Sequence, residues 1–355
     1  MGSNAFRGSH LLLVSSFLLI SLSQTPSKAT SSSCDIFNGS WVFDYSTPPP
    51  YNSAASQCPF ADSALDCIKN GRPDTAYLSY SWRPAGCHLP RFDGKGFLGR
   101  YRGKKVMFVG DSLSSSQWQS LACMLHAADP NQNYTITSRG RITTLFFTAY
   151  GTSIMYMKDG FLVSLVNRKL WLDSLSGSEL WRGVDLLVFN SYHWWLHTGL
   201  YKTWDGYQIG DRTVRDIDMD VMEAYKIALT TWANWVDSNI DQTKTYVFFQ
   251  GISMVHYHGA EWGEPAVQDC KGQTKPVEGS NYPGTRPPGD EVVKSVLHAM
   301  KRPAFLLDIV LMTQLRKDGH PSIYAGGGQL DCSHWCLAGV PDTWNQLMYT
   351  ILLRN

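Results

Sequence analysis

The sequence predicts an α/β fold, arranged as an α/β/α sandwich with a mostly parallel central sheet. Short apolar, β-prone runs occur at residues 106–109, 184–189 and 245–250, and segments with helical spacing lie between them. The first run ends at Gly-Asp-Ser (110–112) and a helical pattern follows at once, which predicts a strand-turn-helix unit. With 43% apolar residues in 355, the chain has ample material for a core.

The first 29 residues are typical of a targeting segment. Arg7 and His10 precede an apolar run at 11–22 that is short for a bilayer span, and Ser27-Lys28-Ala29 fits a cleavage site. We expect residues 1–29 to be a cleaved signal peptide or a short signal anchor. Either one delivers the rest of the chain to the secretory lumen.

Other features fit the secretory lumen. Asn38 and Asn133 begin Asn-x-Ser/Thr sequons, so both are candidate glycosylation sites. The chain has eight cysteines and no C-x-x-C spacing, which favours four disulfides over a metal site. Cys332 and Cys336 stand on either side of His334, so disulfides there would mount this histidine rigidly.

Residues 30–100 are predicted to form an irregular subdomain that disulfides staple together and that wraps onto the domain of residues 101–355. Proline- and glycine-rich turns interrupt this region, and it shows little helical or strand periodicity. Its cysteines are Cys34, Cys58, Cys67 and Cys87.

Ser112 stands where a nucleophile can be exposed, on the turn between the strand at 106–109 and the helix that follows. Gly110 gives this turn its backbone freedom. The N–H groups of the first helical turn point toward negative charge that develops near the hydroxyl. Gly-Asp-Ser alone is weak evidence, because the same three residues recur in turns that only cap a helix.

Between this turn and the end of the chain the α/β pattern continues. β-prone segments are expected at 141–150, 152–157 and 161–166, and a helix with apolar residues every three or four positions at 222–236. Asp218 or Asp220 is its expected N-cap. The later elements are a surface loop at 270–290, a helix at 291–300, a strand at 305–310 and a final amphipathic helix capped by Asp342.

The strand at 184–189 leads into Asn190 and then into His193, Trp194 and Trp195. Ligands usually meet a parallel sheet at the carboxyl ends of its strands. Asn190 is therefore a candidate oxyanion donor, and the two tryptophans are candidates to stack on a sugar. The alternative is an N-capping asparagine and two tryptophans of the core.

The strand at 245–250 leads into His256 and His258. No carboxylate or thiol stands at ligand spacing from these two histidines, so no metal site is predicted.

A carboxylate and an imidazole three positions apart, Asp331 and His334, supply the other parts of a nucleophilic site. A serine hydroxyl is a poor nucleophile until a base takes its proton, and a carboxylate fixes the tautomer of that base. Serine early and Asp-x-x-His late is the order of hydrolases and acyltransferases with a flavodoxin-like α/β/α core. His320 is the rival base, but it precedes a proline in a polar loop and has no carboxylate in register.

The composition excludes some classes of function. A net charge of +1 and 17% charged residues leave no basic surface for nucleic acid. No phosphate-binding glycine-rich loop occurs, and no site for a nucleotide or coenzyme A is recognisable. The 13 Trp and 17 Tyr exceed the usual need of a core, and sugar-binding clefts use such rings, although a Trp-rich core accounts for most of them.

Several sequence blocks, in the same order, resemble the plant trichome birefringence-like proteins of the PC-esterase family. The match runs from about Cys34 to the C-terminus. The blocks are Cys34-Asp35 with Gly39, Trp41 and Val42, Cys58-Pro59-Phe60, Asn70-Gly71-Arg72-Pro73-Asp74, Leu89-Pro90-Arg91-Phe92, Met107-Phe108-Val109-Gly110-Asp111-Ser112-Leu113, His193-Trp194-Trp195 and Asp331-Cys332-Ser333-His334-Trp335-Cys336-Leu337.

This resemblance implies an SGNH-hydrolase-like core and O-acetylation of a plant cell-wall polysaccharide, such as xylan, mannan or pectin, in the Golgi lumen. Ser112 would be the nucleophile, His334 the base and Asp331 the group that orients it. The candidate oxyanion donors are Gly110, Ser112 and Asn190. The candidate substrate-binding residues are Arg91, Gln117, His193, Trp194, Trp195 and His256. The disulfides implied by the resemblance, among about 105 pairings open to eight cysteines, are Cys34–Cys87, Cys58–Cys123, Cys67–Cys336 and Cys270–Cys332.

The chain departs from the family pattern at two places. Many members continue Gly-Asp-Ser-Leu with Ser-Arg-Asn-Gln, whereas this chain has Ser114-Ser115-Ser116-Gln117. It also has Ser253-Met254-Val255-His256 where the family usually has Ser-Pro-Thr-His. These changes leave the expected triad intact and bear on acceptor specificity and on the balance between transfer and hydrolysis.

Two other functions stay open at this point. An acetylesterase acting on pectin would use the same triad with water as the acceptor, and secretion to the cell wall would favour it. A cell-wall polysaccharide (pectin) binding protein without catalysis would explain the aromatic residues but not the triad. We expect no bound cofactor, an acetyl donor of unknown identity, a polysaccharide acceptor and a membrane protein that supplies the acetyl group. Contact with nucleic acid is not expected, and contact with the membrane is expected only through the N-terminal segment.

Overall fold

The computed structural model describes residues 1–2, 34–46, 48–51 and 58–354. The expected targeting segment therefore lies outside the described residues, apart from its first two. Among the helices that are described, none is both long and apolar enough to cross a bilayer.

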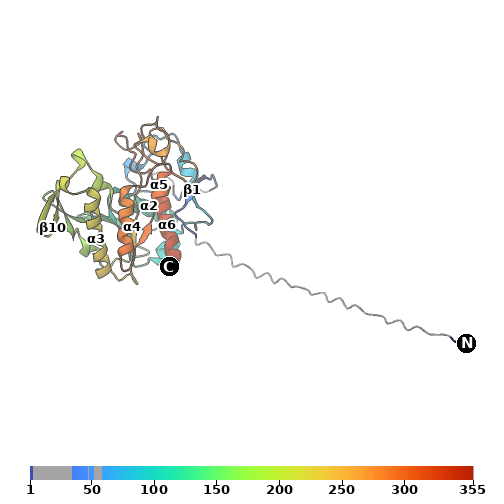
Figure 1. The fold of residues 1–355 in the computed structure, drawn as a ribbon, viewed down its shortest axis with the longest axis horizontal. Coiled ribbons are helices and arrows are strands. Elements are labelled where there is room, and N and C mark those ends of the chain that lie inside the picture. Colours follow the sequence, from blue (N-terminus) through green and yellow to red (C-terminus); the bar gives the residue numbers. More distant parts are fainter. Residues whose placement is uncertain (3–33, 47, 52–57, 355) are drawn as a thin grey trace. The chain divides into compact units, whose positions relative to one another are not determined.

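A seven-stranded mixed sheet forms the centre of the molecule (Figure 1). Five neighbouring strands are parallel, and two antiparallel strands extend one edge. In spatial order the strands are β13 (Phe305–Leu307), β12 (Tyr246–Gln250), β9 (Leu186–Phe189), β3 (Lys105–Gly110), β6 (Thr152–Lys158), β5 (Ile142–Phe147) and β4 (Tyr134–Arg139).

Helices cover both faces of this sheet because alternate residues of its central strands are apolar on both sides. In β3, Val106 and Phe108 face one buried cluster while Met107 and Val109 face another. The first cluster contains α1 (Gly94–Arg100), α2 (Ser112–Ala128) and α6 (Val340–Arg354). The second contains α3 (Val221–Asn239) and α4 (Pro288–Ala299), which pack side by side (Figure 1). The predicted α/β/α sandwich is confirmed.

Two smaller sheets were not predicted. A four-stranded sheet packs its β8 against α3, and the expected strand at 161–166 belongs to it rather than to the main sheet. Its strands, in spatial order, are β11 (Arg212–Arg215), β10 (Gly206–Ile209), β8 (Lys169–Leu175) and β7 (Val163–Val166). In the N-terminal region β1 (Gly39–Phe43) pairs with β2 (Tyr80–Pro84), so residues 30–100 are less irregular than expected.

Four disulfides hold the chain together. One lies within the N-terminal region, and two tie this region to later parts of the chain, at α2 and at the segment before α6. The pairs are Cys34–Cys87, Cys58–Cys123, Cys67–Cys336 and Cys270–Cys332, the same four that the resemblance implies. The two sequon asparagines, Asn38 and Asn133, are exposed.

Helix starts agree with the sequence in one case and differ in another. Asp220 caps α3 by accepting hydrogen bonds from Met222 N at 2.8 Å and Glu223 N at 3.2 Å. Asp342 was expected to precede α6 as its cap, but α6 begins at Val340 and Asp342 lies in its first turn. From there it accepts a hydrogen bond from Gly339 N at 2.8 Å.

Candidate active site

Ser112 is the first residue of α2, directly after β3. Asp111 caps the helix, since its carboxylate accepts a hydrogen bond from Leu113 N at 2.9 Å. A Cβ atom at Gly110 would lie 2.6 Å from both Asn190 O and Ser114 Oγ, so only glycine fits there. The strand-turn-helix unit therefore holds Ser112 at the carboxyl edge of the main sheet.

His334 and Asp331 complete a continuous line with Ser112. His334 Nε2 lies 2.8 Å from Ser112 Oγ, and His334 Nδ1 lies 2.8 Å from Asp331 Oδ2. Because an ionised carboxylate only accepts, Nδ1 carries the proton and Nε2 is free to accept the Ser112 proton. His320 does not reach Ser112: its Nδ1 lies 2.6 Å from the backbone oxygen of His334 instead.

The charges of this line are set by its neighbours. Burial alone would lower the pKa of His334, but the hydrogen bond and charge of Asp331 outweigh it and raise that pKa above its ordinary value of 6.5. Burial would raise the pKa of Asp331, yet its bonds to His334 and to Ser333 N hold it well below the usual carboxyl range. Asp111 and Asp62 add to the elevation of the His334 pKa through their charge.

Asn190 is not a free oxyanion donor. Its side chain is buried. In the amide orientation that satisfies both of its polar atoms, Nδ2 donates to Asp111 Oδ1 at 2.6 Å and to Oδ2 at 3.1 Å. The N–H groups in the first turn of a helix have no intrahelical partner, so the backbone at Ser112 stays the candidate donor. Gly110 is the last residue of β3 and pairs with Lys158 of β6.

A cavity of about 770 Å³ lies against the His334 side of this line. Its walls come from the segment after β9, the segment after β12, the residues before α4, and the segment that carries His334. Its described lining includes Tyr192, Tyr201 and Tyr257 but no tryptophan. The phenol and indole rings that line this cavity are therefore tyrosines, and the two tryptophans expected to stack on a sugar are not among its lining residues.

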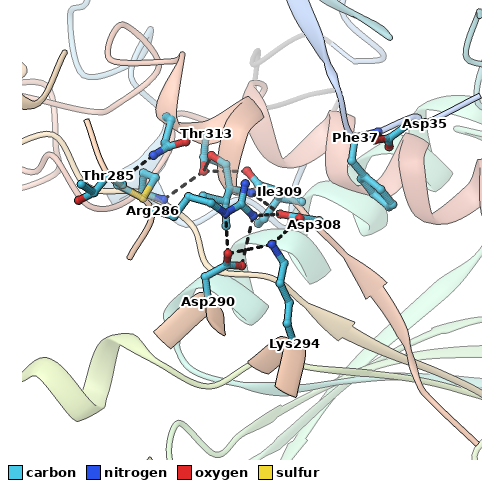
Figure 2. A network of polar contacts seen from close by, with 12 residues as sticks. Asp35, Phe37, Thr285, Arg286, Asp290, Lys294, Asp308, Ile309 and Thr313 are labelled. Atoms are coloured by element: carbon cyan, nitrogen blue, oxygen red, sulfur yellow. Dashed lines mark hydrogen bonds and ion pairs between the residues drawn. The ribbon is translucent and has the colours of Figure 1, made fainter. Parts of the chain in front are cut away.

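An ion-pair cluster anchors one wall of the cavity (Figure 2). Arg286, which lines the cavity, contacts buried Asp290 at 2.5 Å and Asp308 at 2.6 Å, and Lys294 contacts the same two carboxylates. Burial alone would raise the pKa of Asp290, but the hydrogen bonds from Arg286 and Lys294 outweigh it and lower that pKa. Two cations and two carboxylates balance, so the cluster fixes the wall without adding net charge.

Four of the expected substrate-binding residues lie away from this cavity. Gln117 is buried in α2, five positions and about 140° around the helix from Ser112. Trp195 is in the core, with its indole N–H bonded to Ser191 Oγ at 3.0 Å. His256 is fully buried, and Arg91 lines a different cavity, of about 550 Å³. None of these four side chains lines the cavity beside His334.

The other two behave differently. His193 lines the cavity, and its Nε2 atom donates to Ser253 O at 2.9 Å. Trp194 is half-buried, with the Lys158 ammonium 5.6 Å from its ring centroid. Among the described residues, no group of three or more His, Cys, Asp or Glu is arranged to hold a metal ion.

The N-terminal region contributes to the site in a way that sequence reasoning missed. The buried guanidinium of Arg72 donates to Asp318 O at 2.7 Å and to His320 O at 3.1 Å. Leu337 N donates to Leu65 O at 2.9 Å, and Ala64 lines the cavity. Arg72 lies in the Asn70–Asp74 block, which reads as turn chemistry in the sequence because nothing local indicates its distant partners.

Comparisons with known proteins agree with this architecture. Residues 89–351 match the model of the "GDSL/SGNH-like Acyl-Esterase family found in Pmr5 and Cas1p", and residues 32–88 match the "PMR5 N terminal Domain". Protein trichome birefringence-like 42 of Arabidopsis thaliana is 54% identical over 91% of this chain and 90% of its own length. Protein trichome birefringence-like 38 is 51% identical over 90% and 84%, and protein trichome birefringence-like 41 is 46% identical over the whole of both chains.

Proposed function

We propose that this chain, which belongs to the PC-esterase family and within it to the trichome birefringence-like proteins, transfers an acetyl group to a plant cell-wall polysaccharide through an acetyl-enzyme on Ser112. Membership of an acyl-esterase family supports an enzyme of the hydrolase or acyltransferase class. The observation that carries the rest is the unbroken line from Ser112 through His334 to Asp331, with both contacts at 2.8 Å.

In the first half-reaction, Ser112 Oγ attacks the acetyl carbonyl of the donor while its proton passes to His334 Nε2. The tetrahedral oxyanion is held by backbone N–H at the start of α2, an effect usually worth about 3–4 kcal/mol per donor. The donor's leaving group then takes the proton from His334 and departs. The product is an acetyl ester on Ser112.

In the second half-reaction, a sugar hydroxyl attacks this ester and gives its proton to His334 Nε2. The Ser112–acetyl bond breaks, the proton returns to Ser112 Oγ, and the acetylated sugar leaves. Asp331 stays ionised throughout and stabilises the imidazolium that forms in each half-reaction.

Support for a polymeric sugar as the acceptor comes from the cavity. Its lining includes Tyr201, which is 74% exposed and offers a ring face for a pyranose. We further propose that the protein works in the Golgi lumen, with the plant cell wall as the alternative location. A membrane protein would supply the acetyl group.

The test is mass spectrometry of purified protein incubated with an acetyl donor and deacetylated xylan, mannan and pectin oligosaccharides. Ser112→Ala is the inactive variant, and Ser115→Ala, one turn further along α2, is its matched control. We expect a gain of one acetyl mass on one oligosaccharide with wild type and Ser115→Ala, and none with Ser112→Ala.

Two results would contradict the proposal. Free acetate released from pre-acetylated oligomers, with no gain on any acceptor, makes the protein an acetylesterase. Acetyl transfer that persists in Ser112→Ala removes Ser112 from the mechanism.

A further inference from the structure

Behind the catalytic line, two imidazole rings touch in the interior. His256 Nδ1 lies 2.7 Å from His320 Nε2, and both side chains are at most 1% exposed. The outer nitrogen of each ring faces a backbone carbonyl. His320 Nδ1 lies 2.6 Å from the oxygen of His334, and His256 Nε2 lies 2.9 Å from the oxygen of Gln314.

These three contacts restrict where the protons sit. Carbonyl oxygens only accept, so each outer contact requires an N–H, and the contact between the rings requires one more. Two neutral imidazoles have only two protons for the three contacts. One contact must therefore go without a proton, or the pair must take up a third.

Burial favours the neutral pair. Burial lowers the pKa of His256 to about 4 and holds the pKa of His320 well below its ordinary value. The two available protons then belong to the two shortest contacts, because a bare nitrogen facing an oxygen or another bare nitrogen at 2.6–2.7 Å is repulsive.

We propose that His256 and His320 are positioning residues for His334. His256 donates a hydrogen bond from its Nδ1–H to His320 Nε2. His320 in turn donates a hydrogen bond from its Nδ1–H to the peptide carbonyl of His334. The pair is a directed chain of hydrogen bonds that ends on the backbone of the residue whose side chain meets Ser112. His256 fixes the tautomer of His320 by donating to its Nε2, whereas Asp331 fixes the tautomer of His334 by accepting from its Nδ1. The role of His334 as the base rests on the proposed function, whereas the direction of the chain does not.

The surroundings hold both rings in place. The Trp335 ring stacks on His320 with centroids 4.1 Å apart, and the Trp262 ring lies edge-on to His256 at 5.3 Å. The titratable and charged groups that face the pair are Lys317 and Asp318 on its own segment, Asp331 and His334 on the neighbouring segment, Tyr282 on the loop after β12, and Arg72 from the N-terminal region. Asp318 is paired with Arg316, and Lys317 with Glu264, so no strong net charge draws a third proton to the rings.

Nitrogen-15 NMR of histidine-labelled protein at neutral pH tests the direction of the chain without any substrate. We expect both rings as the Nδ1–H tautomer, which is distinct from the Nε2–H tautomer common in solution, with their signals assigned by loss in His256→Asn and His320→Asn. An Nε2–H tautomer on His320 overturns the proposal, because no proton then reaches the His334 carbonyl.

Paired variants test the consequence for His334, with hydrolysis of p-nitrophenyl acetate as the readout of Ser112. His320→Asn keeps an amide N–H near the Nδ1 position, whereas His320→Leu has no donor. We expect His320→Leu to lose about 100-fold in kcat with KM nearly unchanged, and His320→Asn to recover most of that loss. The same pair at His256 follows the same order with a smaller effect, because it acts one bond further away.

Equal losses in the Asn and Leu variants of both positions would overturn the positioning role. If a Leu variant at one position fails to fold, the pair at the other position and the NMR tautomers still decide. Absence of any Ser112-dependent release of p-nitrophenol in wild type, a single burst included, contradicts the acetyl-enzyme of the proposed function instead, and it leaves the tautomer measurement unaffected.

Discussion

The two ends of the catalytic line rest on different kinds of structure. Ser112 stands between β3 and α2, and the contacts that place it lie in its own strand-turn-helix unit and in the neighbouring β9. His334 stands on the segment between α5 (Val310–Gln314) and α6, which has little regular structure and is held by residues from many parts of the chain. The nucleophile is placed mostly by its own strand-turn-helix unit, and the segment of the base mostly by residues far away in sequence.

Several covalent and non-covalent contacts hold this second segment in place. The Cys67–Cys336 and Cys270–Cys332 disulfides, the buried side chain of Arg72 and the histidine pair all attach to residues 318–337. Most of them come from the N-terminal region or from loops. The small N-terminal region therefore holds the segment of the base in place, in addition to packing against α2 and α6.

The largest effect is expected when one disulfide of the His334 segment is removed. The double variant Cys67→Ser with Cys336→Ser opens a link between cysteines 269 residues apart, and we expect a loss of about 3–5 kcal/mol in the free energy of unfolding. The kcat of the protein that remains folded should also fall, because His334 is two residues from Cys336. Urea unfolding and p-nitrophenyl acetate hydrolysis measure the two effects.

The control opens the Cys34–Cys87 link, whose cysteines are 53 residues apart and not on the His334 segment. We expect a loss of about 2–4 kcal/mol with kcat unchanged in the folded fraction. An equal drop in kcat for both double variants would mean that the disulfides act on global stability alone.

Removing the hydrogen bonds of Arg72 should reduce stability and kcat by less than opening the disulfide does. Arg72→Met keeps most of the apolar stem but leaves the carbonyls of Asp318 and His320 without this donor, at about 1–3 kcal/mol for each group left unpaired. We expect about 2–4 kcal/mol less stability, together with a lower kcat. The comparison is Arg83→Met, whose exposed pair with Asp44 should change stability by less than about 1 kcal/mol and leave kcat as it is.

The smallest effect is electrostatic. Asp62 is exposed near His334, and its charge is one of those that raise the His334 pKa. The base works only when neutral, so activity falls as pH drops through that raised pKa. Asp62→Asn, which can still cap its short 3-10 helix, should lower the His334 pKa and move the acid limb of kcat/KM to lower pH, by less than about half a unit.

Measuring the pH dependence of kcat/KM for wild type and Asp62→Asn at low and high salt checks this prediction. The shift should shrink in high salt, because exposed charges are screened. A shift toward higher pH would contradict the sign of the effect.

The same contrast explains what the sequence could predict about the fold. The strands β3, β9 and β12 and the helix α3 are visible because their apolar patterns are local, and Asp220 was one of two caps expected for α3. In the sheet of β7, β8, β10 and β11 only β7 was expected as a strand, and the sheet itself is not visible because β10 pairs in parallel with β8 across an intervening segment. The pairing of β1 with β2 joins residues about forty positions apart for the same reason.

The site divides in the same way. The residues Ser112, Asp331 and His334 were found because each stands in a short chemical pattern, and the structure brings all three together. Gln117 and His256 stand in blocks compared with the family pattern and Trp195 follows the end of a strand, and the structure turns each of them into the core. Nearness along a chain does not fix direction, because a helix or a strand exit rotates successive side chains away from each other.

The order of these parts along the chain also determines when it becomes reactive. During synthesis Ser112 leaves the ribosome 222 residues before His334, and the cysteines beside His334 close only onto partners that were made earlier. A chain interrupted in between has helix α2 and a serine without a base. The proposed acyl chemistry therefore requires a chain whose last segment has been made, folded and oxidised, so a truncated chain would be inactive even if α2 had formed.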